Sequence, residues 1–120
     1  MKYAINVPNF SEYSDAQTVA NLAAEAEDAG WDAFFTWDHL TGMGQKMGDP
    51  QVTLTAITCN TSKIMLGPMV TPLPRRRPWK VAVETLNLQN LSKGRLIMGV
   101  GLGAPPEEYT NYGENPSLRH

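Results

Sequence analysis

The sequence contains little cysteine and little histidine, which limits the chemistry it can support. One cysteine, Cys59, and two histidines occur among 120 residues. A single cysteine cannot form an internal disulfide, and no second Cys or His stands at metal-ligand spacing, so a secreted disulfide scaffold and a structural zinc site are both disfavoured. We therefore predict no metal site and expect a reducing, cytoplasmic location.

Charge of one sign and long apolar runs are also missing. Twelve acidic and ten basic residues leave a formal charge of −2, so there is no basic footprint of the kind that binds nucleic acid or anionic membranes. No stretch approaches the roughly 18 consecutive apolar residues of a membrane helix, and the N-terminal apolar run is too short for a signal peptide. We expect a soluble protein without nucleic-acid or membrane partners.

Short apolar runs alternate with segments of helical periodicity. The apolar runs predict four buried strands, at 3–7, 31–37, 64–70 and 96–100. Helices are predicted from Ser14 as N-cap to Gly30, from Asp49-Pro50 through Cys59, and from Pro78 to Gly94. This β-α-β-α-β-α-β order is typical of a parallel sheet covered by helices.

The middle helix is the least obvious of these elements. Residues 52–58 are β-branched and alternating, which by propensity alone favours a strand. Asp49-Pro50, however, is an N-cap followed by proline at the first helical position. Two parallel strands also need a crossover element between them, so we predict a helix here.

Two architectures share this order of elements. A small open doubly wound sheet is complete at about this length, whereas a (β/α)8 barrel needs roughly 250 residues. A chain of 120 residues would supply only half of such a barrel. Periodicity does not choose between the two.

The residues that follow the strands are the candidates for chemistry, because working groups of parallel α/β folds gather at the carboxyl ends of the strands. Asp38 and His39 come directly after the second predicted strand. His39 stands where a general acid or base, or a hydrogen-bond donor to a ring ligand, would lie. The alternative is a structural histidine bonded to a neighbouring loop. Asp38 could orient the imidazole or cap the loop.

Two further segments follow predicted strands. Gly99-Val100-Gly101-Leu102-Gly103 lacks the G-x-G-x-x-G spacing, and Pro105-Pro106 stop a helix from opening there, so a Rossmann phosphate site is not predicted. Backbone without side chains lets a flat ligand, or side chains of the neighbouring strand, approach closely. Arg75-Arg76-Arg77 could grip an anion, but a solvated charge run is the more common explanation.

A succession of short motifs resembles one known family. The motifs are Gly30-Trp31-Asp32, Trp37-Asp38-His39, Asp49-Pro50, Leu66-Gly67-Pro68-Met69-Val70-Thr71-Pro72, Arg77-Pro78, and Gly94-Arg95-Leu96 through Gly103. In this order and spacing they closely resemble the luciferase-like monooxygenase family over essentially the whole chain. The resemblance implies an α/β fold in which residues 1–120 are the N-terminal half of a (β/α)8 TIM barrel, part of a longer barrel domain. It also implies a flavin- or deazaflavin-dependent oxidoreductase that acts on a small-molecule substrate.

The family resemblance also assigns roles to residues. His39 matches a histidine that faces the ring of the bound cofactor in many members, and it is the candidate catalytic residue. Met69–Val70 falls where members commonly have a non-proline cis peptide behind the flavin. The implied cofactor is FMN or the deazaflavin coenzyme F420, and the candidate cofactor-binding residues are Asp38, Met69, Val70, Thr71 and Gly101.

Two positions depart from one branch of the family. The sugar-phosphate dehydrogenases carry Trp four residues after the histidine and Glu directly after the glycine run, where this chain has Met43 and Ala104. The resemblance therefore argues against a sugar-phosphate substrate.

The alternative function is a catalytically inactive half-barrel that acts as a self-associating structural module. Four strands leave two sheet edges unpaired, and strand residues such as Phe34, Ile64 and Leu66 would lack the opposing half of a barrel. We therefore expect a homo-oligomer in which two copies pair their half-barrels with two-fold symmetry.

Overall fold

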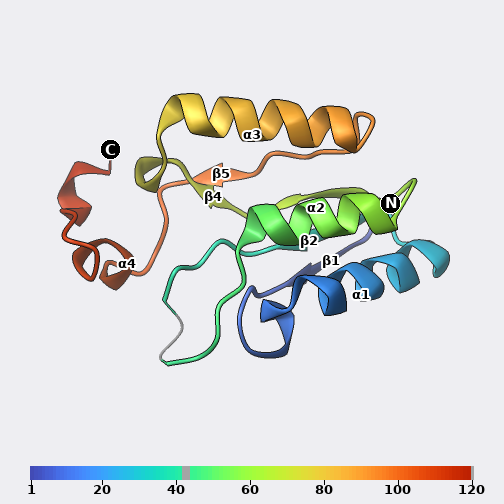
Figure 1. Ribbon diagram of the computed structural model, residues 1–120, viewed down its shortest axis with the longest axis horizontal. Coiled ribbons are helices and arrows are strands. Elements are labelled where there is room, and N and C mark those ends of the chain that lie inside the picture. Colours follow the sequence, from blue (N-terminus) through green and yellow to red (C-terminus); the bar gives the residue numbers. More distant parts are fainter. Residues whose placement is uncertain (42–43, 120) are drawn as a thin grey trace.

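The structure, a computed structural model, describes residues 1–41 and 44–119 (Figure 1), so Met43 lies outside the described residues. The strands are β1 (Ala4–Val7), β2 (Ala33–Thr36), β3 (Met65–Pro68), β4 (Thr71–Pro72) and β5 (Val100–Gly101). The helices are α1 (Ala16–Asp28), α2 (Pro50–Asn60), α3 (Pro78–Leu91) and α4 (Glu107–Thr110), with 3-10 turns η1 (Ser11–Ser14), η2 (Leu73–Arg75) and η3 (Pro116–Leu118). None of the helices in these two ranges has the length and apolar character that a membrane span requires.

The first three strands form a parallel sheet in the order β1-β2-β3. The register places Val7 beside Thr36 and Thr36 beside Pro68, so the three strands end at one edge. The predicted α/β alternation is confirmed for these strands and for α1 and α2. The segments that follow the strands, with their candidate functional residues, therefore start from the same edge of the sheet.

The predicted fourth strand is present only in part. The Leu66 N–H donates to the Arg95 carbonyl at 3.0 Å and the Ile97 N–H to the Leu66 carbonyl at 2.8 Å, so this segment runs parallel to β3. A Cβ on Gly67 would lie 1.8 Å from the Ile97 carbonyl oxygen, which shows how closely the two backbones approach. Pro68 has no N–H to continue the ladder, and pairing resumes where β4 meets β5.

The outer strand segment is not buried as predicted. Ile97 and Val100 are exposed, and β5 pairs with one described strand, β4. The sheet of the described residues is therefore open on the side of β5.

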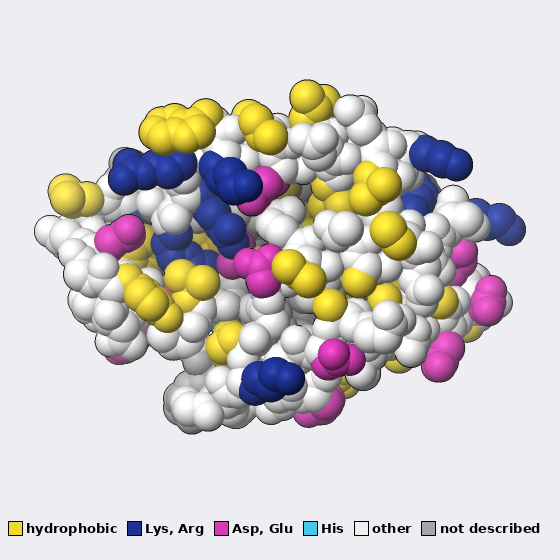
Figure 2. Space-filling view, viewed as in Figure 1, with side chains coloured by type: hydrophobic (Ala, Val, Ile, Leu, Met, Phe, Trp, Pro, Cys, Tyr) yellow, Lys and Arg dark blue, Asp and Glu magenta, His cyan; other side chains and the backbone are white. Residues whose placement is uncertain are grey.

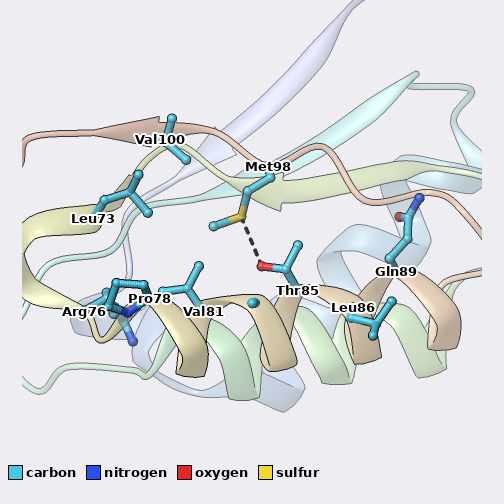
Figure 3. A pocket seen from close by; sticks show the side chains of 10 residues that line it. Leu73, Arg76, Pro78, Val81, Thr85, Leu86, Gln89, Met98 and Val100 are labelled. Carbon is cyan, nitrogen blue, oxygen red and sulfur yellow. Dashed lines mark hydrogen bonds between the residues drawn. The ribbon is translucent and has the colours of Figure 1, made fainter.

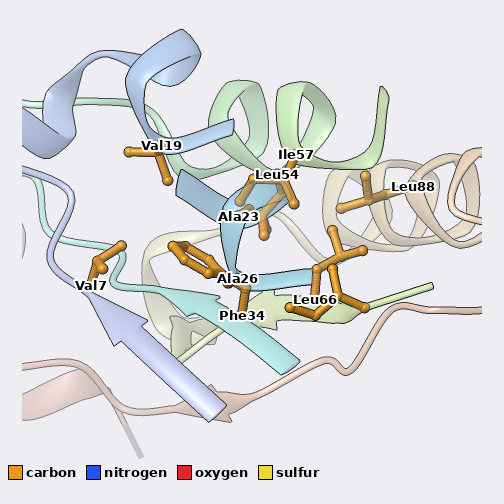
Figure 4. Packing of buried hydrophobic residues seen from close by; sticks show 10 residues of the cluster. Val7, Val19, Ala23, Ala26, Phe34, Leu54, Ile57, Leu66 and Leu88 are labelled. Carbon is orange, nitrogen blue, oxygen red and sulfur yellow. The ribbon is translucent and has the colours of Figure 1, made fainter. Parts of the chain in front are cut away.

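The hydrophobic core lies between the sheet and the helices α1 and α2 (Figure 4). Val19 and Ala23 of α1, Leu54 of α2, Phe34 of β2 and Leu66 of β3 are fully buried. Ile64, just before β3, is also buried. The expectation that these strand residues lack a cover is wrong, because helices of the same chain cover them.

The first turns of α1 and α2 are stabilised by aspartate N-caps. Asp49 caps α2 by accepting two backbone N–H groups of the first turn, at 2.8 and 3.0 Å, which favours a helix in this β-branched segment. Ser14 is not the N-cap of α1, because it belongs to η1. Asp15 takes that role and accepts the Thr18 N–H at 2.8 Å.

Helix α3 forms as predicted from Pro78, but most of its large apolar residues face solvent. Leu88 is buried, whereas Trp79, Val83 and Leu86 are 68%, 57% and 61% exposed. Hydrophobic side chains gather along the upper border of the molecule in Figure 2, where Figure 1 places α3. Uncovered apolar surface therefore lies on α3 and on the outer strand segment, and not on the buried strand residues named above.

Candidate functional site

Side chains from different strand ends meet at the carboxyl edge of the sheet. Asn9, after β1, is fully buried, and its amide binds the segment that follows β2. Its Nδ2 donates to the His39 carbonyl at 2.9 Å, and its Oδ1 accepts the His39 N–H at 3.0 Å. Nδ2 also donates to the Gly48 carbonyl at 2.8 Å. One side chain thus holds the main chain of His39 on both sides of the residue.

The His39 side chain contacts a glutamate from α4. His39 Nδ1 lies 2.7 Å from Oε1 of Glu108, whose side chain is completely buried. The same Oε1 accepts the Leu40 N–H at 2.9 Å, and Oε2 lies 2.5 Å from Arg75 Nη1. The His39 side chain itself is 29% exposed, so part of the imidazole is accessible.

Asp38 joins two arginines beside this contact. Its carboxylate oxygens lie 3.2 Å from Arg75 Nη2 and 2.6 Å from Arg76 Nη2, and Arg75 also donates to the Asp38 carbonyl. Burial raises the pKa of Asp38 above its ordinary value, while Arg76 and Arg75 act in the opposite direction. We call Asp38, His39, Arg75, Arg76 and Glu108 the charge cluster. Its two carboxylates are balanced by two guanidinium groups.

The interpretation of residues 75–77 as a solvated charge run is wrong for two of the three arginines. The side chains of Arg75 and Arg76 are 4% and 20% exposed. Buried carboxylates need charged or hydrogen-bonding partners, which explains why these arginines turn inward. Arg77 does extend to the surface, with its guanidinium 6.0 Å from the centre of the Trp79 ring.

His39 lies in the walls of two cavities. Cavity A has a volume of about 240 Å³ and is lined by Trp37, Asp38, His39, Met69, Val70, Pro72, Gly103 and Ala104. Four of the six predicted site residues therefore line one cavity. The peptide between Met69 and Val70 is cis, as predicted.

The other two predicted residues, Thr71 and Gly101, do not line cavity A. Thr71 is buried, and its Oγ1 has no hydrogen-bond partner among the described residues. A Cβ on Gly101 would lie 2.8 Å from Val70 Cγ2. Of the two alternatives for the glycine run, a neighbouring side chain is therefore what approaches Gly101.

Several larger hollows lie elsewhere in the described part of the chain. Cavity B, of about 540 Å³, is lined by Phe10, His39, Thr41, Gln45, Pro105, Glu107 and Asn111. The α3 groove, of about 600 Å³, lies between α3 and residues 98–100, and most of its lining residues are apolar (Figure 3). It shares no lining residue with cavities A and B. The α3 groove is therefore separate from cavities A and B, although Arg76 of the charge cluster lies in its wall.

Sequence reasoning missed Glu108, because it predicts only a weakly helical or irregular tail from Glu107 onward. The expectation that Pro105-Pro106 stop a helix is wrong, because α4 begins directly after Pro106. Proline followed by two glutamates is typical of the first turn of a helix. The contact with His39 spans 69 positions, however, and no local pattern indicates it.

Comparisons with known proteins agree with the motifs and the fold. Limonene 1,2-monooxygenase of Rhodococcus erythropolis is 30% identical over 108 residues, which cover 90% of this chain and 27% of that protein. The structure of the coenzyme F420-dependent tetrahydromethanopterin reductase of Methanopyrus kandleri matches with a TM-score of 0.79 and 28% identity, over 93% of this chain and 30% of that one.

A third relative shares the fold at lower identity. The oxygenating constituent of 3,6-diketocamphane monooxygenase from Pseudomonas putida, solved in complex with FMN, has a TM-score of 0.79 at 23% identity, over 94% of this chain and 32% of that one. The present chain thus spans less than a third of the length of these three relatives. The family model for luciferase-like monooxygenase matches residues 1–120 without a gap at either end. The chain belongs to the luciferase-like monooxygenase family.

Proposed function

We propose that this chain forms the N-terminal half of a barrel and supplies part of the active site of a flavin- or deazaflavin-dependent oxidoreductase. In the proposed reaction, a hydride moves between the cofactor ring and a small organic substrate. The observation that carries the proposal is the place of His39, which lines both cavity A and cavity B. A histidine shared by two cavities can serve a cofactor in one and a substrate in the other.

The residues around cavity A fit a flat cofactor ring. Trp37, Met69 and Val70 offer apolar surface, and His39 offers a ring nitrogen. Thr71 follows Val70 outside the cavity lining, and its buried Oγ1 has no hydrogen-bond partner among the described residues. A complete small-molecule site occupies roughly 300–1,000 Å³, so cavity A, at about 240 Å³, has the size of a partial site. Relatives bind FMN or depend on F420, and either group supplies a ring that accepts or donates a hydride.

Each predicted residue has a role in this proposal. His39 holds or moves a proton at the edge of the ring, while Met69 and Val70 form the wall behind it. Asp38 acts through shape and through the arginines it binds, because its carboxylate oxygens are already paired. Gly101 supports the Val70 wall from behind, because it lets the Val70 side chain approach the backbone closely, and Thr71 continues the strand after Val70.

The proposal needs residues beyond those of this chain. Active sites of such barrels are built from loops after several strands of both halves, and the matched residues make up less than a third of each of the three relatives. The charge cluster is internally paired, and the sheet edge near β5 is open. Both features are compatible with a half-barrel that further strands complete. The single cysteine favours a reducing, cytoplasmic compartment.

A second candidate function is a self-associating structural module. It is favoured by the exposed apolar face of α3 and by the adjoining α3 groove, where Val81 and Met98 face each other (Figure 3). In a complete barrel this surface would lie against the next strand and helix.

Visible absorbance separates the two candidates. The pure chain is titrated with FMN and, separately, with F420, and the same titrations are repeated with His39→Ala. If the chain forms part of an oxidoreductase active site, one of the two cofactors should show a saturable spectral shift. His39→Ala should bind that cofactor more weakly. If the folded chain shifts neither spectrum, the result contradicts cofactor binding by this chain. The self-associating structural module is then the remaining candidate.

A further inference from the structure

We propose that Glu108 is a positioning residue that fixes the tautomer of His39, with the proton on Nδ1 and the lone pair on Nε2. The role of this tautomer in catalysis rests on the proposed function, but the assignment of the tautomer does not. The sequence motifs and the family resemblance assign no role to Glu108.

The hydrogen bonds around Glu108 decide which atom carries the proton. Oε1 accepts the N–H groups of Leu40 and Thr41, at 2.9 and 3.4 Å, and Oε2 is paired with Arg75 at 2.5 Å. Every one of these partners is a donor, so Glu108 serves only as an acceptor, as an ionised carboxylate does. His39 Nδ1, at 2.7 Å from Oε1, must therefore donate as well. The neutral imidazole then carries its lone pair on Nε2.

The rest of the surroundings restrain the imidazole. Asn9 binds both the N–H and the carbonyl of His39, which fixes the main chain. The Trp37 ring packs edge-on against the imidazole, with ring centres 5.5 Å apart. No hydrogen bond joins Nε2 to the residues at 1–41 and 44–119, and the side chain lines cavities A and B. Nε2 is thus the nitrogen available to a ligand.

With its lone pair on Nε2, the neutral imidazole can accept a proton from a ligand in cavity A or B, for example the O–H proton of an alcohol. In the proposed reaction, an alcohol substrate would give its O–H proton to Nε2 and its C–H hydride to the cofactor ring, the O–H electron pair would form the C=O bond, and His39 would become an imidazolium. The Nδ1–H bond to the Glu108 carboxylate stabilises that cation without moving a second proton. Charge-assisted hydrogen bonds of this kind are stronger than neutral ones.

Long-range ¹H–¹⁵N NMR measures the tautomer directly. His120→Asn leaves His39 as the single histidine of the chain, and spectra are recorded at about pH 8.5, where imidazole is neutral. The expected result is a protonated, pyrrole-type Nδ1 and an unprotonated, pyridine-type Nε2, against the mixture seen for the same chain in urea. A folded chain with its proton on Nε2, or with the urea mixture, overturns the proposal.

A matched pair of variants tests whether Glu108 is the cause. Glu108→Ala removes the acceptor oxygen and should abolish the single Nδ1–H pattern, whereas Glu114→Ala, at an exposed glutamate of the same C-terminal segment, should preserve it. An unchanged pattern in folded Glu108→Ala overturns the proposal. Circular dichroism checks folding, and if Glu108→Ala does not fold, the tautomer of the parent chain still tests the proposal. The NMR samples contain no cofactor, so a failure of the cofactor titrations would contradict the proposed function without affecting this test.

Discussion

The Glu27 carboxylate accepts the backbone N–H of Ile64 at 2.7 Å and so fastens α1 to the start of β3. It also accepts the N–H groups of Ser62 and Lys63, at 3.0 and 2.6 Å. Burial alone would raise the pKa of Glu27, but these N–H groups outweigh it and lower the pKa from 4.5 to about 2. The ionised form is therefore the one that the fold stabilises.

Acid should weaken the fold through Glu27. Because its pKa is lowered on folding, its contribution is fully present above about pH 4.5 and is lost as the pH falls toward 2. Solvent screens this partly exposed group, so we expect the contribution to be about 1–2 kcal/mol. Urea midpoints measured against pH should fall less steeply in Glu27→Gln than in the parent chain. Glu25→Gln, on the same helix, should keep the parent slope, and equal slopes for all three chains would contradict the assignment.

Gly67→Ala should disrupt the pairing of β3 with the outer strand segment. Its Cβ would lie 1.8 Å from the Ile97 carbonyl oxygen, and backbone cannot move aside as a flexible side chain does. We expect a loss of about 3 kcal/mol or more in the free energy of unfolding. Gly30→Ala meets no atom within 4 Å and strains only the φ of +85°, so it should cost about 1 kcal/mol. Equal urea midpoints for the two variants would argue against the close approach.

His39→Ala should lower turnover about 10²-fold or more in a chain that contains the complete barrel, the usual effect of losing a positioned acid or base. Steady-state kinetics that follow the conversion between the oxidised and the reduced cofactor measure this turnover. Cofactor binding followed in parallel separates a lost proton-transfer group from a damaged site. Unchanged turnover would remove His39 from the mechanism.

The isolated chain should associate through the exposed face of α3. Burial of apolar surface contributes about 25 cal/mol per Å², and Trp79, Val83 and Leu86 are all more than half exposed. Sedimentation at micromolar concentration should show a species larger than 13.2 kDa. Val83→Lys combined with Leu86→Lys should restore the monomer, while Val52→Lys on α2 should not. A stable monomer of the parent chain would show that this face needs no cover from a second copy.

The sequence by itself determined the order and type of most elements. Asp49-Pro50 indicated a helix against the β propensity of residues 52–58, because a cap and a proline act on the first turn locally. Apolar runs indicated β1 to β3 for the same local reason. The motif of Met69–Val70 predicted its cis peptide through the family resemblance.

Only the tertiary structure decided which side chains meet. Glu108 reaches His39 across 69 positions, and Arg75 and Arg76 turn inward to two carboxylates although their sequence is that of a surface charge run. The sequence places several large apolar residues in α3, but whether they are buried depends on which segments pack against the helix. Local patterns report backbone preference and amphipathicity, whereas burial and charge pairing depend on contacts between distant segments, which form only when the chain folds.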